Sequence, residues 1–285
     1  MTQPLYRRLR RLLQPTGEAR ALAMALLQDA ASLTMADVLA GKADDLPIAD
    51  QERLTAMAEH IAGGEPLQYV VGWQRFCGLR IAVSPGVLIP RPETEALVTW
   101  AIDLLRPFPQ PAVLDIGTGS GCIALALKSA FPQASIEAWD MSPEALAIAH
   151  RNAERLALPI TFRRIDLFDD SIEEIDGTRG EFLDGIISNP PYVCLSERAE
   201  MEANVLCHEP SVALFVPDDD PFLFYRPIAH YAQQHLRPGG YVLVEINRRF
   251  GPDVINLFRR YGFGNPVLRD DPFGLPRMVC ARKCS

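Results

Sequence analysis

The feature that most constrains the fold is an alternation, from Ala112 onward, of short apolar segments with longer amphipathic ones. Short apolar segments predict strands, and amphipathic segments predict helices. The expected strands are residues 113–116, 135–139, 161–165, 185–188 and 241–246. The expected helices among them are 122–131, 143–156 with Ser142 as its N-cap, 223–236 and 253–261, and a further helix over 94–105 precedes the first strand. Val267 and residues 278–281 predict a closing hairpin. This order is typical of a doubly wound, Rossmann-like α/β sheet, here with a terminal antiparallel hairpin.

The first 68 residues have a different pattern and predict a small helical bundle. Thr34 is a suitable N-cap with Asp37 three residues later, and Gly63-Gly64 ends the last helix. Leucines recur at helical spacing (Leu5, Leu9, Leu12 and Leu13), and residues 18–30 and 48–61 continue the helical pattern. Residues 69–90 predict two short strands around a glycine turn. We therefore expect a helical domain over 1–68, a β-hairpin linker over 69–90 and the α/β domain over 91–285.

Composition limits the partners and the compartment. A formal net charge of −8 disfavours a stable complex with duplex DNA, which is bound largely through neutralised phosphates. The single basic cluster is Arg7, Arg8, Arg10 and Arg11, which is either a solvated face or a docking patch for an acidic or RNA-containing partner. No apolar run reaches the ~18 residues that a membrane span needs. The six cysteines are scattered and form no metal-binding pattern, so we expect reduced thiols, no metal and a cytoplasmic location.

A glycine-rich stretch, residues 115–121, follows the first strand of the expected sheet and is called the glycine turn below. Its members Gly117, Thr118, Gly119, Ser120 and Gly121 let the backbone approach a ligand and offer N–H groups to an anion. Asp140 closes the next strand, where an acid accepts hydrogen bonds from ribose hydroxyls. The spacing differs from the dinucleotide G-x-G-x-x-G, and Asp115 would repel a pyrophosphate. The pattern therefore favours S-adenosylmethionine over a nicotinamide cofactor, with a plain strand-to-helix turn as the alternative.

Asp166 and Leu167 follow the third strand, where an adenine ring would lie. Asp166 is suited to accept the exocyclic amine, and Leu167 to pack on the ring. The alternative for Asp166 is a helix cap or an exposed loop acid.

The residues Asn189-Pro190-Pro191-Tyr192, called the NPPY segment below, follow the fourth strand. Two prolines remove two N–H donors and stiffen the chain, so the segment offers acceptors: the Asn189 side-chain oxygen and the Pro190 carbonyl. Tyr192 adds a flat wall. Such a segment suits a planar amide or amine held by its N–H groups, or else is a stiff turn. Its place at the switch point of the sheet favours the first reading.

The chain resembles the HemK/PrmC family, the glutamine N5-methyltransferases of peptide chain release factors. The resemblance rests on the segments at residues 65–69, 88–95 (Leu-Ile-Pro-Arg-Pro-Glu-Thr-Glu), 114–121, 188–192 and 209–210. It implies a class I S-adenosylmethionine-dependent fold and cofactor binding by Gly117 to Gly121, Asp140, Leu167 and Asn189. It also implies that the NPPY segment holds the glutamine of the Gly-Gly-Gln loop and that the helical domain helps to recognise the release factor.

From these observations we expect Asn189, Pro190 and Tyr192 to be catalytic. The NPPY segment with Arg91 is expected to bind substrate, and Asp166 to join the cofactor site. The expected partners are class 1 release factors, with RNA contact only through the ribosome or the arginine cluster. Three alternatives stay open: a ribosomal-protein glutamine methyltransferase, an adenine-N6 DNA methyltransferase, and a non-catalytic, cofactor-gated binder of release factors.

Two segments depart from the family pattern. Residues 216–222 stand where many members have Gly-Gly-x-Asp-Gly-Leu. Glu245-Ile246-Asn247 and then Phe250 stand where Glu-Ile-Gly with a following Gln is common. We expect both departures to affect the rim of the pocket and not the reaction.

Overall fold

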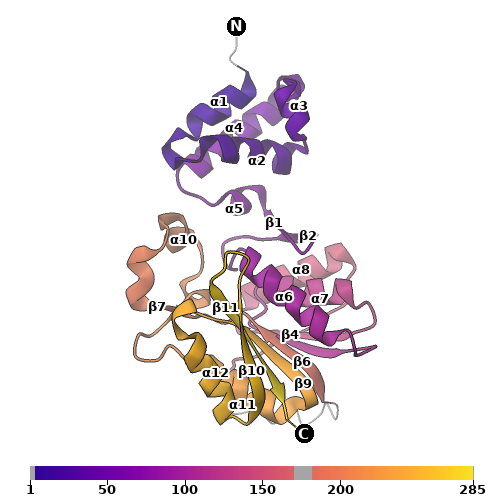
Figure 1. Cartoon of the computed structure of the whole chain (residues 1–285). Coiled ribbons are helices and arrows are strands. Elements are labelled where there is room, and N and C mark those ends of the chain that lie inside the picture. The colour runs from indigo at the N-terminus through magenta and orange to yellow at the C-terminus, as the bar shows by residue number, and fades with distance from the viewer. Residues whose placement is uncertain (1–3, 170–181, 285) are drawn as a thin grey trace. The chain divides into compact units, whose positions relative to one another are not determined.

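The computed structural model describes residues 4–169 and 182–284, and the chain divides into two compact units (Figure 1). The helical unit comprises Met1–Trp73 with Met201–Glu209. The sheet unit comprises Gln74–Glu200 with Pro210–Ser285. Each unit is described by itself below.

The helical unit is a bundle around its own apolar core. Leu9, Leu26, Leu27 and Leu54 are fully buried in this core. At the start of α3, the Asp37 N–H donates to Thr34 Oγ1 at 3.1 Å and the Thr34 N–H donates to Asp37 Oδ2 at 3.0 Å, which confirms the predicted cap. The helices are α1 (Leu5–Leu12), α2 (Ala19–Ala31), α3 (Met35–Leu39), α4 (Ile48–Ala62), α5 (Leu67–Val71) and α10 (Ala203–His208), with 3₁₀ turns η1 (Gln14–Thr16) and η2 (Lys42–Asp45).

The hairpin predicted over residues 69–90 is shorter than expected. Residues 67–71 form helix α5, and the strands are β1 (Trp73–Phe76) and β2 (Leu79–Ala82). Cys77 and Gly78 join them with φ of 46° and 79°, in the left-handed region that tight turns use. The prediction that the first strand includes Val70 and Val71 was wrong, because these two residues end helix α5 and pack on the core of the helical unit.

The sheet unit contains a seven-stranded sheet in the order β10-β11-β9-β6-β3-β4-β5. Neighbours from β9 to β5 are parallel, and β11 is antiparallel to both β9 and β10. The strands are β3 (Ala112–Ile116), β4 (Ser135–Asp140), β5 (Thr161–Arg164), β6 (Leu183–Ser188), β9 (Leu236–Glu245), β10 (Phe263–Asp270) and β11 (Pro276–Lys283). This arrangement confirms the doubly wound sheet with a terminal antiparallel hairpin.

Helices cover both faces of the sheet (Figure 1). On one face lie α6 (Pro92–Leu105), α7 (Cys122–Ala130) and α8 (Pro143–Leu156), and on the other lie α11 (Tyr225–His235) and α12 (Gly251–Arg260). Every residue of β6 is buried, as a parallel strand covered on both faces requires. A second, two-stranded sheet pairs β7 (Val193–Cys194) with β8 (Phe215–Val216), which the sequence did not predict. The connections include η3 (Leu195–Glu200), η4 (Ser211–Ala213) and η5 (Arg248–Phe250).

The strand order brings two of the predicted motifs together. The chain winds from β3 to β4 and β5 in one direction, and then from β6 to β9 in the other. Ile116 at the end of β3 pairs with Ser188 at the end of β6, and the Ser188 hydroxyl donates to the Ile116 carbonyl at 2.7 Å. The glycine turn and the NPPY segment therefore begin side by side at the switch point, where open α/β sheets bind ligands.

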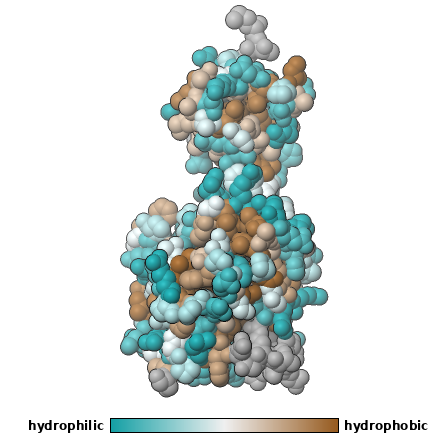
Figure 2. All heavy atoms as spheres, turned by 90° about the vertical axis from the view of Figure 1, so that its right-hand side faces the viewer, coloured by the Kyte–Doolittle hydropathy of each residue, from teal (hydrophilic) through white to brown (hydrophobic). Residues whose placement is uncertain are grey.

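The surface mixes polar and apolar side chains over both units on the face drawn in Figure 2. Within residues 4–169 and 182–284, no helix is both long enough and apolar enough to span a membrane.

Candidate active site

A single cavity at the carboxyl ends of β3, β4 and β6 collects most of the predicted site residues. Those that line it are Gly117, Thr118, Gly119, Ser120, Asp140, Asp166, Leu167, Asn189, Pro190 and Pro191. Three predicted residues of the described chain are not among its lining residues: Arg91, Gly121 and Tyr192. Arg91 directly follows the lining residue Pro90, and the other two support the wall from behind.

The three glycines of the turn differ in what they allow. Gly117 and Gly119 have φ of 73° and 55°, and a Cβ on either would meet nothing within 4 Å. Both therefore leave open space on the cavity side. Gly121 has φ of 82°, and its Cβ would lie 3.2 Å from Ala149 Cβ of α8. Gly121 is thus needed for close helix packing rather than for ligand approach.

The main-chain amides of the glycine turn are partly engaged within the protein. The N–H groups of Gly117 and Thr118 both donate to the Trp139 carbonyl at 2.9 Å. The Gly119 N–H donates to Asp140 Oδ2 at 2.8 Å. The sequence suggested that amides here bind an anion, but these three are committed to the end of β4. The turn therefore acts mainly as a rigid wall.

Asp115 supports this wall from below. Its Oδ2 accepts hydrogen bonds from the Thr118 hydroxyl at 2.6 Å and from the Ala124 N–H at 3.2 Å. Its Oδ1 is buried and has no hydrogen-bond partner within the described residues. Complete burial raises the pKa of the Asp115 carboxyl to about 7, although both hydrogen bonds oppose the rise.

Asp140 closes β4 at the cavity. Its Oδ1 accepts the Ser142 N–H at 2.9 Å, and its Oδ2 accepts the Gly119 N–H. Burial raises the pKa of this carboxyl above its ordinary value. Each carboxylate oxygen can accept two hydrogen bonds, so Asp140 keeps acceptor capacity toward the cavity. That capacity matches a pair of ribose hydroxyls.

The far wall of the cavity is apolar with an acidic edge. Leu167 lines it and packs on the core of the sheet unit. Asp166 is exposed, and its Oδ1 accepts the Phe168 N–H at 3.0 Å. The Phe168 and Phe224 rings lie 5.2 Å apart between centroids, and both residues line the cavity. Sequence reasoning missed Phe224, because it lies before α11 in a stretch without a recognisable motif.

Behind the NPPY segment lies a buried carboxylate. Asn189 Nδ2 donates to Thr94 Oγ1 at 3.0 Å, and the Thr94 hydroxyl donates to Glu245 Oε2 at 2.7 Å. The Tyr192 hydroxyl donates to Glu245 Oε1 at 2.7 Å. Thr94 and Glu245 are 2% and 1% exposed. Burial raises the pKa of Glu245, and burial together with the Glu245 charge raises that of Tyr192. The structure thus directs the Tyr192 hydroxyl inward, away from the cavity.

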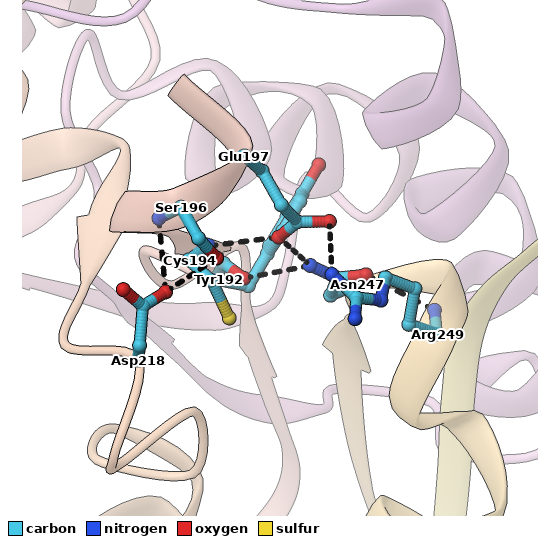
Figure 3. A network of polar contacts seen from close by, with 7 residues as sticks. All are labelled: Tyr192, Cys194, Ser196, Glu197, Asp218, Asn247 and Arg249. Atoms are coloured by element: carbon cyan, nitrogen blue, oxygen red, sulfur yellow. Dashed lines mark hydrogen bonds and ion pairs between the residues drawn. The ribbon is translucent and has the colours of Figure 1, made fainter. Parts of the chain in front are cut away.

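The residues that follow the NPPY segment, 193–200, are called the rim segment below and are held by side chains from both departures (Figure 3). Asn247 Nδ2 donates to Glu197 Oε2 at 2.7 Å and to the Tyr192 carbonyl at 3.2 Å. Asp218 Oδ1 accepts the Ser196 N–H at 2.9 Å and the Ser196 hydroxyl at 2.7 Å. The two departures therefore act together on one stretch of backbone.

The arginine cluster on α1 is not uniform. Arg7, Arg10 and Arg11 are exposed. Arg8 is only partly exposed, and its Nη2 donates to the Gln51 carbonyl of α4 at 3.5 Å. Arg8 thus contacts the bundle, and the other three form the basic surface.

Comparisons with known proteins agree with the two-part chain. The family model of the PrmC N-terminal domain matches residues 5–72, and that of the methyltransferase small domain matches residues 100–212. Relatives from several bacteria are named release factor glutamine methyltransferase, among them two of high identity. The protein of Bacteroides thetaiotaomicron is 43% identical over 94% of each chain, and that of Flavobacterium psychrophilum is 42% identical over 75% of this chain and 74% of its own. A methyltransferase structure from Pyrococcus furiosus shares the fold, with a TM-score of 0.51 and 18% identity over 73% of this chain and 90% of that one.

Proposed function

The chain belongs to the family of release factor glutamine methyltransferases, and from this premise we propose its reaction. It transfers a methyl group from S-adenosylmethionine to the side-chain amide nitrogen of the glutamine in the Gly-Gly-Gln motif of class 1 peptide chain release factors. The observation that carries the proposal is the commitment of Asn189 Nδ2 to Thr94, which leaves Oδ1 as an acceptor at the cavity.

The residues of the cavity fit S-adenosylmethionine. Gly117 and Gly119 leave space where a side chain would fill it, and Asp140 has acceptor capacity for the ribose. Leu167 provides an apolar surface for the adenine, and Asp166 stands at the edge for its amine. When bound, the cofactor supplies an electrophilic methyl group on a sulfonium.

The chain's own part in catalysis is to orient the amide nitrogen. A carboxamide nitrogen is a poor nucleophile because its lone pair is delocalised into the carbonyl. Asn189 Oδ1 and the Pro190 carbonyl accept hydrogen bonds from the two N–H groups of the substrate amide. The amide nitrogen then faces the methyl group, and the positive charge that develops on the nitrogen lies next to acceptors. The surplus proton leaves to solvent after transfer. Pro191 keeps the backbone stiff, so the acceptors need no reorganisation.

Recognition of the release factor falls to surfaces outside the cavity. We assign Arg91, next to the lining residue Pro90, to contact with the substrate backbone, and the helical unit to the body of the release factor. Residues 5–72 match the family model of the PrmC N-terminal domain, which supports this assignment. The net charge of −8 counts against a DNA substrate.

Labelled S-adenosylmethionine with a purified class 1 release factor tests the proposal. Label on the Gly-Gly-Gln glutamine supports it, whereas label only in DNA or in a ribosomal protein refutes it. Asn189→Ala should lower turnover by about 10²–10³-fold, because one preorganised group is lost. Cofactor binding should weaken but stay measurable. Near-normal turnover of that variant would refute the role of Asn189.

A further inference from the structure

We propose that Glu245 is a positioning residue: through the Thr94 hydroxyl, its buried carboxylate fixes the Asn189 amide with the oxygen facing the substrate nitrogen. The inference rests on the proposed function, since it concerns the group that receives the substrate amide. Glu245 ends β9, Thr94 lies in the first turn of α6, and Asn189 follows β6. All three belong to the sheet unit.

The direction of each hydrogen bond follows from the carboxylate. An ionised carboxylate can only accept hydrogen bonds. Thr94 Oγ1 lies 2.7 Å from Glu245 Oε2, so the Thr94 hydroxyl must donate its one hydrogen bond to Glu245. Toward Asn189, Thr94 can then only accept, so the atom of the Asn189 amide 3.0 Å away must be Nδ2. The oxygen and the nitrogen of an asparagine amide are similar in size, and their hydrogen-bond partners decide which of them faces each way. The charge on Glu245 thus decides which end of Asn189 faces the cavity.

The same carboxylate holds the other end of the NPPY segment. The Tyr192 hydroxyl donates to the second oxygen, Oε1, at 2.7 Å. Each oxygen of Glu245 therefore orders one end of the segment. The two prolines between Asn189 and Tyr192 have fixed φ angles, so the backbone between the two held ends is also restrained.

The charged and titratable neighbours of Glu245 come from several elements. Arg277 of β11 favours the ionised carboxylate, and Glu93 of α6 disfavours it. Tyr225 of α11 donates its hydroxyl to the Glu245 main-chain carbonyl at 3.2 Å. Burial is the largest influence and raises the Glu245 pKa. A protonated Glu245 could donate, and the order imposed on Thr94 would be lost. Turnover should therefore fall at acidic pH.

The fixed orientation of the Asn189 amide determines which substrate groups the site can bind. A nitrogen that approaches Asn189 Oδ1 must carry a hydrogen. A flipped amide would present Nδ2 and would repel the N–H of a glutamine side chain. Glu245 thus makes the site selective for nitrogen donors without touching the substrate.

Three variants of the full chain test the inference. Thr94→Val keeps the shape and removes the hydroxyl, Thr94→Ser keeps the hydroxyl, and Glu245→Gln removes the charge. We expect Thr94→Val and Glu245→Gln to lower kcat for release-factor methylation by about 10²–10³-fold. The Kd for S-adenosylmethionine should change less than about threefold, because Thr94, although it lines the cavity, is assigned no contact with the cofactor above, and the Asn189 side chain stays in place in both variants. Thr94→Ser should stay within about threefold of the wild type in kcat. The double variant should be no slower than the slower single one, since both changes act through one amide.

A second measurement does not depend on activity. Asparagine-selective ¹⁵N labelling reports hydrogen exchange at Asn189 Nδ2, identified by the loss of its signals in Asn189→Ala. Thr94→Val removes the hydrogen bond to Thr94, and Glu245→Gln removes the charge that fixes its direction, so both should speed this exchange by about tenfold, whereas Thr94→Ser should not. Equal exchange in Thr94→Ser and Thr94→Val, or a kcat of Thr94→Val near the wild-type value, would overturn the inference. A wild-type enzyme that fails to label the release factor would instead overturn the proposed function.

Discussion

Replacing Asn247 with alanine should loosen the rim segment specifically. The side chain makes three hydrogen bonds: to the Glu197 carboxylate, to the Tyr192 carbonyl and, through Oδ1, from the Arg249 N–H at 3.0 Å. The bond to a charged group contributes about 1.5–3 kcal/mol, and each neutral bond about 1 kcal/mol. Water can replace part of this stabilisation in the variant, because the Glu197 side chain is 17% exposed and can bind solvent. We therefore expect the free energy of opening the rim segment to fall by about 2–4 kcal/mol.

Limited proteolysis measures this change directly. Arg198 is exposed within η3 and is a trypsin site in the middle of the rim segment. Cleavage through local opening follows the opening free energy, so a loss of about 2 kcal/mol predicts about 30-fold faster cleavage at Arg198. The matched control is Asn256→Ala, because Asn256 is exposed on α12 and accepts one hydrogen bond from Arg259. An increase of less than threefold at Arg198 in Asn247→Ala would refute the reasoning.

Three further predictions concern other parts of the chain. Gly121→Ala should lower the free energy of unfolding, measured in urea, by about 2–4 kcal/mol, because of the left-handed φ and the 3.2 Å contact of the new Cβ with α8. The control is Gly274→Ala, where φ is 79° but a Cβ would meet nothing within 4 Å, and it should lower this free energy by only about 1 kcal/mol. The pKa of Asp115 is raised to about 7 in the folded protein from an ordinary 3.8. Between these two pH values the unfolded chain loses this proton more readily than the folded one, so the wild type loses stability as pH rises. The stability of Asp115→Asn relative to the wild type should therefore increase by about 3 kcal/mol between pH 5 and pH 8, and an unchanged difference would contradict the raised pKa. Reversing Arg7 and Arg11 to glutamate should raise KM for the release factor if the exposed arginines dock it, and an unchanged KM would make them a solvated face.

Periodicity predicted the elements of the sheet unit well, because buried parallel strands and amphipathic helices leave repeating patterns. The predicted strand at residues 161–165 and helix at 122–131 differ from β5 and α7 by one residue. The two-residue strands β7 and β8 leave no such pattern, and they form because the residues directly after the NPPY segment pair with the returning chain at residues 215–216. The cavity wall at Phe224 and the inward turn of Tyr192 also depend on contacts between distant segments. Local sequence carries no signal for either.

The segment Pro-Arg-Pro-Glu-Thr-Glu gains a physical role from the buried network. Thr94 Oγ1 accepts a hydrogen bond from Asn189 Nδ2, and the Thr94 hydroxyl donates one to Glu245 Oε2. The next residue, Glu95, accepts the Cys77 N–H at 3.0 Å and so holds the tight turn between β1 and β2. Adjacent residues on a helix point about 100° apart, so one turn of α6 can serve the NPPY segment and the hairpin at once. Arg91 adopts extended backbone just before α6, and a proline at the first helical position is pre-organised for this start. The prolines thus fix where α6 begins, and that start sets which residue, Thr94, meets Asn189.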